Sequence, residues 1–359
     1  MNQGIVSYEA LLSYTAKVLE HFGYSDEQAR VTARVLVEAD ARGIPSHGVA
    51  RLWFYESNIK TGAAFLQAEP EIVHETPLSL TVDGHNGIGP HIAQFTMSRV
   101  VEKAKAVGAG FGAVRNSNHF GMAGLWAEMA TAEGFMGMAF CNTRVTSIPT
   151  FGCERVMGTN PVCFAIPSSG KTHFMLDMAT TVVARGKVEV YARRGKDLPL
   201  GWAVDEHGRE TTDTMHLEEL FKSDQPRGGH LFLGGAGEEL GGHKGYGLGV
   251  LVELLSAGMS MGAWSRDTFS ANGAAISCFF AAIRTDLFGN AADIADHVEE
   301  ILDGIRHSDK AEGHERIYIH GEKEAEARAN ALAEGVFLDE ATWGMLEKFA
   351  DRFDLEKLA

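Results

Sequence analysis

The chain has 359 residues, of which 45% are hydrophobic and 22% charged, a composition that suits about two globular domains with a sizeable buried core. Its formal net charge is -16, from 32 basic and 48 acidic residues. A surface this acidic repels nucleic acids and anionic membranes, so neither is expected as a partner.

The cysteine content and the first residues indicate the compartment. The four cysteines, at positions 141, 153, 163 and 278, form no Cys-x-x-Cys pair and are too sparse for a disulfide framework. Residues 1–14 lack the basic and apolar stretches of a signal peptide, and no apolar run reaches the ~18 residues of a membrane span. We therefore expect a cytoplasmic protein with reduced, packed cysteines.

The first 60 or so residues are predicted to be helical. One helix is expected over 7–23, with Ser7 as its N-cap, and a second opens with a capping box at 25–28 and runs to Ala41. A third helix is expected from Ser46, as its cap, to residue 62.

From residue 78 the pattern changes to short β-branched or apolar runs that alternate with glycine-rich turns and helices. Strands are expected at 78–83, 111–115, 136–141, 163–166, 174–176 and 276–283, and helices at 92–107, 121–133, 181–194 and 246–259. This mixed order predicts an α+β or α/β core, followed by an acidic, helix-rich segment from residue 292.

Two glycine-rich segments resemble nucleotide-binding motifs but do not fit them. Residues 108–113 match GxGxxA, yet a helix is expected before them and a strand after them, the reverse of the dinucleotide-binding order. In residues 237–244, His243 interrupts the P-loop pattern and Gly245 replaces its hydroxyl residue. The segment 241–247, with Lys244, is equally compatible with an anion-binding loop and a flexible turn.

The cluster Ser46-His47-Gly48-Val49-Ala50-Arg51 is the first candidate site. On the expected helix, His47 and Arg51 would share one face, four residues apart. Histidine is a proton donor near neutral pH, and arginine offers a planar fork for a carboxylate. Reduction of a 2-keto acid needs both groups, although a solvated pair is the usual role of such residues.

Three more polar clusters lie at strand ends. They are residues 116–121 with His119, residues 157–161, and residues 177–181 with Asp177. Strand-to-helix junctions commonly carry site residues in such folds. Asp177 is expected to cap a helix or to bind a ribose. Because the sequence contains no HExxH and no CxxC motif, a metal site is not expected. A serine hydrolase is not expected either.

Together these segments resemble the malate/L-lactate dehydrogenase family, which is unrelated to the Rossmann-type lactate and malate dehydrogenases. The motifs lie in order along nearly the whole chain: SHGVARL (46–52), NSNHFGMAG (116–124), MGTNP (157–161), DMATT (177–181), ARGKVEVYARRGKDLPLGWAVDEHGRETTD (184–213) and GGHKGYGLGVLVELLSA (241–257). Several independent long motifs make a chance match implausible.

The resemblance implies a non-Rossmann, mixed-sheet α+β core over 76–289 that binds NAD or NADP, and a helical domain formed by 1–75 with 290–359. It also implies a homodimer. His47 and His119 are the implied acid/base residues, with Ser46 supporting His47, and Arg51 and Thr159 are the implied substrate-binding residues. The implied cofactor-binding residues are His119, Phe120, Gly121, Met122, Ala123, Thr143, Asp177, Met178, Ala179 and Lys244.

Two departures from the family matter. Its cyclic-imine reductases carry an acidic residue where this chain has Lys187, which counts against imine reduction. Many members have a Pro-Gly-Glu turn, bordering the cofactor, where this chain has His320-Gly321-Glu322.

The resemblance favours a 2-hydroxy acid and its 2-keto acid as substrates. Segments 231–242 and 313–324 look most like malate dehydrogenases, so malate and oxaloacetate are preferred, ahead of L-lactate, sulfolactate, ureidoglycolate or a diketogulonate-type acid. Two alternatives of other classes stay open. One is a non-catalytic nucleotide-binding protein that uses 241–247; the other is a metal-dependent enzyme built on His47, His119 and His243.

Overall fold

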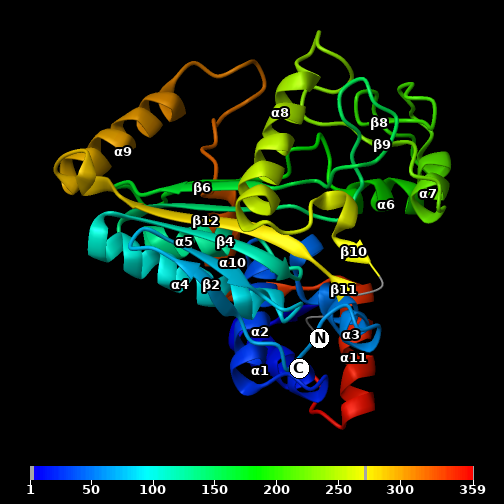
Figure 1. The fold of residues 1–359 in the computed structure, drawn as a ribbon, viewed down its shortest axis with the longest axis horizontal. Coiled ribbons are helices and arrows are strands. Elements are labelled where there is room, and N and C mark those ends of the chain that lie inside the picture. Colours follow the sequence, from blue (N-terminus) through cyan, green and yellow to red (C-terminus); the bar gives the residue numbers. More distant parts are fainter. Residues whose placement is uncertain (1–3, 271–272, 359) are drawn as a thin grey trace.

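The chain begins with two packed helices, as predicted. In this computed structural model, which describes residues 4–270 and 273–358, α1 (Tyr8–His21) starts after Ser7, whose Oγ accepts a hydrogen bond from the amide of Ala10 (Figure 1). The capping box that opens α2 (Asp26–Ala41) is present, with Ser25 and Gln28 bonding each other's backbone amides.

The predicted start of the third helix is wrong. Residues 45–51 form two short 3₁₀ turns, separated by an extended Gly48, and α3 (Leu52–Lys60) follows. Ser46 therefore caps no helix, and His47 and Arg51 do not share a helical face. The physical reason lies at Gly48, which has an extended backbone (φ -83°, ψ -165°), and at Val49, whose amide donates to the carboxylate of Asp40 at 2.7 Å.

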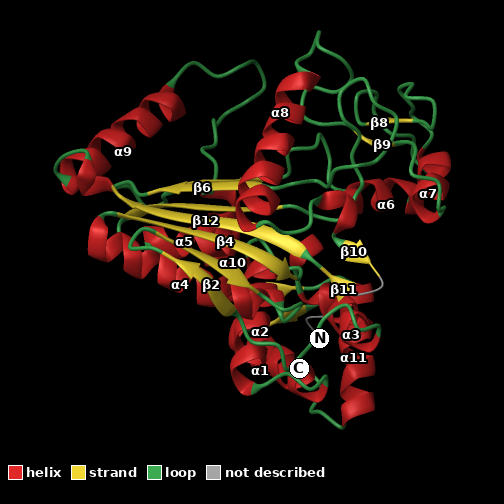
Figure 2. Ribbon diagram, viewed as in Figure 1, coloured by secondary structure: helices red, strands yellow, loops and turns green. Residues whose placement is uncertain are grey.

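A seven-stranded mixed sheet forms the centre of the molecule (Figure 2). Its order is β2 (Glu71–Glu75), β3 (Ser79–Asp83), β4 (Ala109–Ser117), β12 (Ile276–Arg284), β5 (Phe135–Cys141), β6 (Val162–Ile166) and β7 (Phe174–Met178). The pair β3–β4 is parallel and each other neighbouring pair is antiparallel. This is the predicted α+β arrangement, and it lacks the run of parallel strands that a Rossmann fold requires.

Helices cover both faces of the sheet. α4 (Gly89–Val107) and α5 (Gly124–Thr131) lie on one face, and α8 (Gly242–Glu253) rises from the other (Figure 1). Gly108 ends α4 with a left-handed φ of 98°, and β4 starts at the next residue. The glycines of 108–113 therefore form a helix end and a turn, as predicted, because glycine adopts positive φ without a Cβ clash.

Several predicted boundaries are shifted. The helix expected at 121–133 starts at Gly124, and the one expected at 181–194 is α6 (Arg185–Arg193). α8 starts at Gly242 rather than at 246, so most of the glycine-rich segment 241–247 is helical. A small lobe with α6, α7 (Thr214–Lys222), β8 (Ala203–Val204) and β9 (Gly229–His230) lies beside α8 (Figure 1).

The two ends of the chain meet. β1 (Ile5–Val6) pairs with β13 (Val336–Phe337), and α1 and α2 share a hydrophobic core with α11 (Glu340–Phe353). α10 (Glu322–Glu334) lies against α2, whereas α9 (Ala291–His307) stands on the α8 side of the sheet (Figure 1). The domain boundaries at 75/76 and 289/290 stay a prediction.

The remaining short strands, β10 (Phe269–Ser270) and β11 (Gly273–Ala274), pair in antiparallel orientation. Among residues 4–270 and 273–358, no helix combines the length and the apolar character needed to cross a membrane.

Candidate active site

The predicted site segments converge on one edge of the sheet. The register pairs Ser117 with Ile276, Cys141 with Cys278, and Val162 with both Phe140 and Met178. Strands β4, β5 and β7 therefore end, and β6 begins, at the same edge. This arrangement brings together residues 118–123, 142–143, 159–161 and 179–181, which are far apart in the sequence.

Two stacked histidines form the centre of the candidate site. The rings of His47 and His119 lie 5.6 Å apart, with an angle of 18° between their planes. Oγ of Ser46 is 3.0 Å from Nδ1 of His47, and the hydroxyl of Tyr55 is 2.9 Å from Nδ1 of His119. Nε2 of each ring is thus left without a hydrogen-bond partner among the described residues.

Both histidines are neutral at neutral pH. Burial, and after it the charge of Arg51, lowers the pKa of His47 to about 4. Burial holds the pKa of His119 well below its usual range, with smaller contributions from His47 and Arg51. The expected proton donor near neutral pH is therefore not charged in the free protein. Burial disfavours the charged imidazolium, and the guanidinium of Arg51 adds to this effect.

Arg51 keeps most of its hydrogen-bonding capacity. Its Nε donates to the carbonyl oxygen of Ser46 at 2.7 Å, which orients the side chain beside the histidines. Its two terminal NH₂ groups have no partner in the described part of the chain. A half-buried guanidinium in this state is suited to bind a carboxylate with both terminal nitrogens.

Thr143 and Thr159 form a second polar pair at the same edge. Their hydroxyls are 3.3 Å apart, and Oγ1 of Thr143 accepts the amide of Thr159 at 2.9 Å. Asn160, with a φ of 40°, donates to the carboxylate of Glu253 at 2.9 Å. Glu253 is only 8% exposed and also accepts from Asn142 at 3.3 Å. These buried contacts fix the turn that carries Thr159.

Asp177 lies on β7 and faces the start of α5. Its Oδ2 accepts the amide of Gly124 at 2.6 Å, so it caps the N-terminus of a helix distant in sequence rather than the one that follows it. Asp177 and Met122 line a cavity of about 290 Å³. Ile44, which precedes the turn that carries His47, also lines this cavity, as do His320 and Gly321.

A larger cavity, of about 710 Å³, adjoins the first one. Arg42, Met175, Gly321 and Glu324 line both cavities. The side chains of Phe120 and Ala123 are buried, 3% exposed each. Of residues 120–124, Met122 lines the smaller cavity, together with Asp177.

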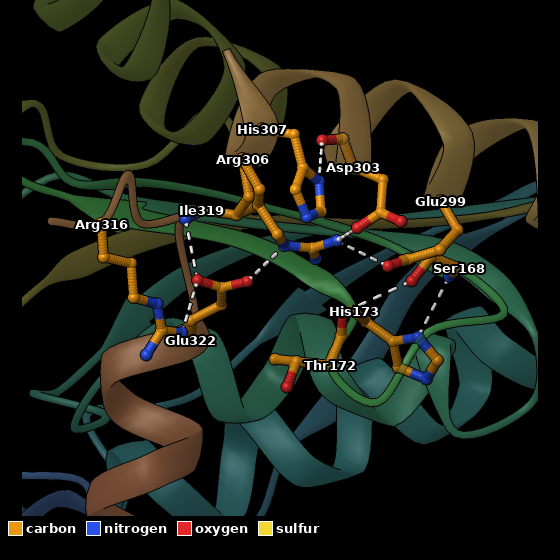
Figure 3. Close-up of polar contacts among 10 residues, drawn as sticks. All are labelled: Ser168, Thr172, His173, Glu299, Asp303, Arg306, His307, Arg316, Ile319 and Glu322. Carbon is orange, nitrogen blue, oxygen red and sulfur yellow. Dashed lines mark hydrogen bonds and ion pairs between the residues drawn. The ribbon is translucent and has the colours of Figure 1, made fainter. Parts of the chain in front are cut away.

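The turn at 320–321 is held by an ion-pair network. Figure 3 shows Arg306 of α9 between Glu322 on one side and Glu299 and Asp303 on the other. Glu322 is 7% exposed; it accepts Nε of Arg306 at 2.6 Å, Arg316 at 3.0 Å and the amide of Ile319 at 3.1 Å. The turn that departs from the family pattern is therefore fixed by charges.

Some predicted residues stay apart from the histidines. Lys244 and His243 are exposed in the first turn of α8, and no described contact joins either of them to His47 or His119. Met178 and Ala179 lie at the end of β7 and immediately after it. Among the described residues, no group of three His, Cys, Asp or Glu side chains is arranged to hold a metal ion.

Tyr55 and Asp40 are site residues that were not predicted from the sequence. Tyr55 follows Arg51 by four residues, a spacing that places both near the same end of α3. Asp40 accepts the backbone amide of Val49 at 2.7 Å. The only signal in the sequence for Asp40 is its place between two alanines near the end of a helix. This pattern does not distinguish a buried acidic residue from an exposed one.

Comparisons with known proteins agree along the whole chain. A family model described as malate/L-lactate dehydrogenase matches residues 6–347. A malate dehydrogenase of Pyrococcus abyssi is 42% identical over 88% of this chain and 85% of its own length, and that of Pyrococcus horikoshii is 39% identical over 98% and 96%. The solved structure of malate dehydrogenase from Entamoeba histolytica superposes with a TM-score of 0.93, at 32% identity, over 98% of each chain.

Proposed function

This chain belongs to the malate/L-lactate dehydrogenase family, and from that premise we propose that it interconverts an L-2-hydroxy acid and its 2-keto acid by hydride transfer with NAD or NADP. Malate and oxaloacetate are the proposed pair. This choice rests on the relatives named malate dehydrogenase, at 42% and 39% identity. The observation that carries the proposal is the stacked His47–His119 pair beside the unpaired terminal nitrogens of Arg51.

In the proposed reduction, Arg51 binds the substrate carboxylate through its terminal nitrogens. This contact would place the 2-keto oxygen near the unpaired Nε2 atoms of the histidines, and Thr159 is a proposed substrate contact on the resemblance. His47 donates the proton to this oxygen, and Ser46 orients the ring through Nδ1. The carboxylate supplies the negative charge that the free site lacks, so it raises the pKa of His47 toward neutrality.

The bound nicotinamide cofactor supplies or accepts the hydride. The residues that fit such a cofactor are Asp177, whose carboxylate is suited to ribose hydroxyls, and the backbone of His119, Phe120, Gly121, Met122 and Ala123 at the start of α5. Two cavities of about 290 and 710 Å³, which share four lining residues, support a place for the cofactor beside Asp177 and Met122. Thr143, Met178, Ala179 and Lys244 remain proposed cofactor contacts on the resemblance alone. A homodimer and a cytoplasmic location are proposed on the same ground.

Other acids of the family are the alternatives. L-lactate, sulfolactate, ureidoglycolate and diketogulonate-type acids differ in the substituent on the carbon that carries the hydroxyl or keto group, and one or two pocket side chains select among such substituents. Lys187, at the position of an acidic residue in the cyclic-imine reductases, lies on α6 with its Nζ 5.3 Å from the ring centre of Trp202. This positive charge continues to count against an imine substrate.

The decisive experiment follows the absorbance of reduced nicotinamide. NADH and NADPH are each offered oxaloacetate, pyruvate and a panel of further 2-keto acids. We expect oxidation with oxaloacetate, and the preferred cofactor is identified in the same assay. A non-catalytic nucleotide-binding protein would bind cofactor without oxidising it, and a metal-dependent enzyme would lose its activity with a chelator.

Variants then test the roles of the site residues. His47→Ala and Arg51→Ala should each lower kcat/KM by at least about a hundredfold, and Arg51→Lys should not restore it, because a point charge does not replace a planar fork. Arg30→Ala, at a surface ion pair with Asp26, is the matched control. Full turnover in both His47→Ala and Arg51→Ala would refute the assignment.

A further inference from the structure

Tyr55 contacts His119 in the candidate site. It lies on α3, is 4% exposed, and its hydroxyl oxygen is 2.9 Å from Nδ1 of His119. The same oxygen is 3.4 Å from the carbonyl oxygen of His119. Burial keeps the pKa of Tyr55 above its usual value, so the hydroxyl retains its hydrogen at working pH. This one hydrogen has two possible acceptors.

The distances favour the ring nitrogen. At 2.9 Å the contact with Nδ1 has the length of a good hydrogen bond, whereas 3.4 Å to the carbonyl is long for an O–H donor. A neutral imidazole has one N–H and one acceptor nitrogen. If Nδ1 accepts from Tyr55, the ring proton must be on Nε2. If Nδ1 instead donates to Tyr55, Nε2 has no hydrogen and becomes the acceptor.

The surroundings fix the orientation of the ring. His47 stacks on one side of His119 at 5.6 Å, and the Phe54 ring meets it edge-on at 5.7 Å and 81°. Tyr55 is therefore placed to set which nitrogen carries the proton, while the neighbouring rings set where Nε2 points.

We propose that Tyr55 is a positioning residue that donates its hydroxyl hydrogen to Nδ1 of His119 and so holds the neutral ring in its Nε2–H tautomer. His119 then offers a hydrogen-bond donor to the keto oxygen or to the cofactor, and it does not act as a base. The functional part of this inference rests on the proposed dehydrogenase activity. The tautomer itself does not.

The tautomer is measured by NMR on protein labelled with ¹⁵N-histidine. Pyrrole-type and pyridine-type ring nitrogens resonate in separate regions, and the His119 signals are assigned by their loss in His119→Gln. We expect a pyridine-type Nδ1 and a pyrrole-type Nε2 in the unmodified protein. In Tyr55→Phe we expect a mixture of tautomers. A pyrrole-type Nδ1 in the unmodified protein, or an unchanged His119 spectrum in Tyr55→Phe, would overturn the proposal.

Kinetics supply the second measurement. Tyr55→Phe should lower kcat by about tenfold, the effect of one weakened transition-state hydrogen bond, with cofactor affinity changed by less than about twofold. Tyr14→Phe is the control, because the buried Tyr14 hydroxyl donates to the carbonyl of Leu346 at 2.6 Å in the same helical core, away from the histidines. It should keep kcat and the His119 spectrum. If no acid is reduced at all, the proposed function fails, while the NMR result still decides the tautomer.

Discussion

The carboxylate of Asp40 accepts a hydrogen bond of 2.7 Å from the backbone amide of Val49, between the two 3₁₀ turns that carry His47 and Arg51. Val49 is fully buried, and Gly48 leaves room for the carboxylate where any side chain would collide with it. A side chain of α2 therefore holds the position of the two groups on which the proposed chemistry depends.

The first prediction concerns this contact. Asp40→Ala removes the acceptor of a buried amide, so we expect the free energy of unfolding to fall by about 1–3 kcal/mol and kcat/KM to fall at least tenfold. Burial raises the pKa of Asp40 to about 7, so the neutral acid is well populated and Asp40→Asn, which keeps an acceptor oxygen, should be close to the unmodified protein. Urea unfolding and steady-state rates test both variants. Equal activity in Asp40→Ala would contradict the role of this contact.

The second prediction concerns proton uptake. The pKa of His47 is about 4 in the free protein, so this ring is neutral at pH 6. Carboxylates bound at Arg51 raise that pKa, and the complex must then take up a proton from the buffer. Uptake should be clear at pH 6 and vanish at high pH, where His47 is neutral in both states.

Calorimetry of malate binding to the complex with reduced cofactor, in buffers of different ionisation enthalpy, measures this uptake. His47→Gln should abolish it. Equal uptake in the variant would assign the proton to another group.

The third prediction concerns acid stability. His230 is fully buried, and neither ring nitrogen has a hydrogen-bond partner among the described residues. Burial, with Arg185 and Arg155 nearby, lowers its pKa to about 3. In the unfolded chain its pKa is near 6.5. Below pH 6.5 the unfolded state therefore binds a proton that the folded state does not, so stability is lost as the pH falls from about 6.5 toward 3.

At pH 4.5 this loss amounts to at most about 3 kcal/mol. His230→Phe, which places a ring of similar size beside Phe221, should flatten the pH dependence in urea unfolding at pH 4.5 and 7.5. The exposed His314→Gln is the control and should leave the pH dependence unchanged. An identical acid loss in His230→Phe would exclude this histidine as its source.

The fourth prediction concerns the turn at 320–321. Glu322→Gln weakens the ion pairs with Arg306 and Arg316 that hold this turn against the cavity (Figure 3). We expect the dissociation constant of the cofactor to rise about five- to tenfold, with kcat changed much less, because the turn borders the ligand and not the histidines. Fluorescence titration of the reduced cofactor measures this constant.

Glu326→Gln removes an exposed ion pair with the same Arg316 and should change the constant by less than about twofold, since exposed pairs contribute little. A similar rise of the dissociation constant in Glu322→Gln and Glu326→Gln would show that cofactor binding does not depend on the ion pairs of Glu322.

Much of the secondary structure followed from local patterns. The capping box at Ser25, the end of α4 at Gly108 and the strand at 276–283 depend on neighbouring residues or on short periodicity, so the sequence alone predicted them. The turn at Gly48 was missed because its cause, the carboxylate of Asp40, belongs to another element.

The motifs were sufficient to predict the family and to name His47, His119, Arg51 and Asp177 as candidates. Only the tertiary structure decided which of them meet. The stacking of His47 on His119, the contact of Tyr55 with Nδ1 and the bond from Gly124 to Asp177 join residues on separate elements. Sequence periodicity describes one element at a time, whereas the ring separation and the lowered histidine pKa depend on how several elements pack, because packing sets both distance and burial.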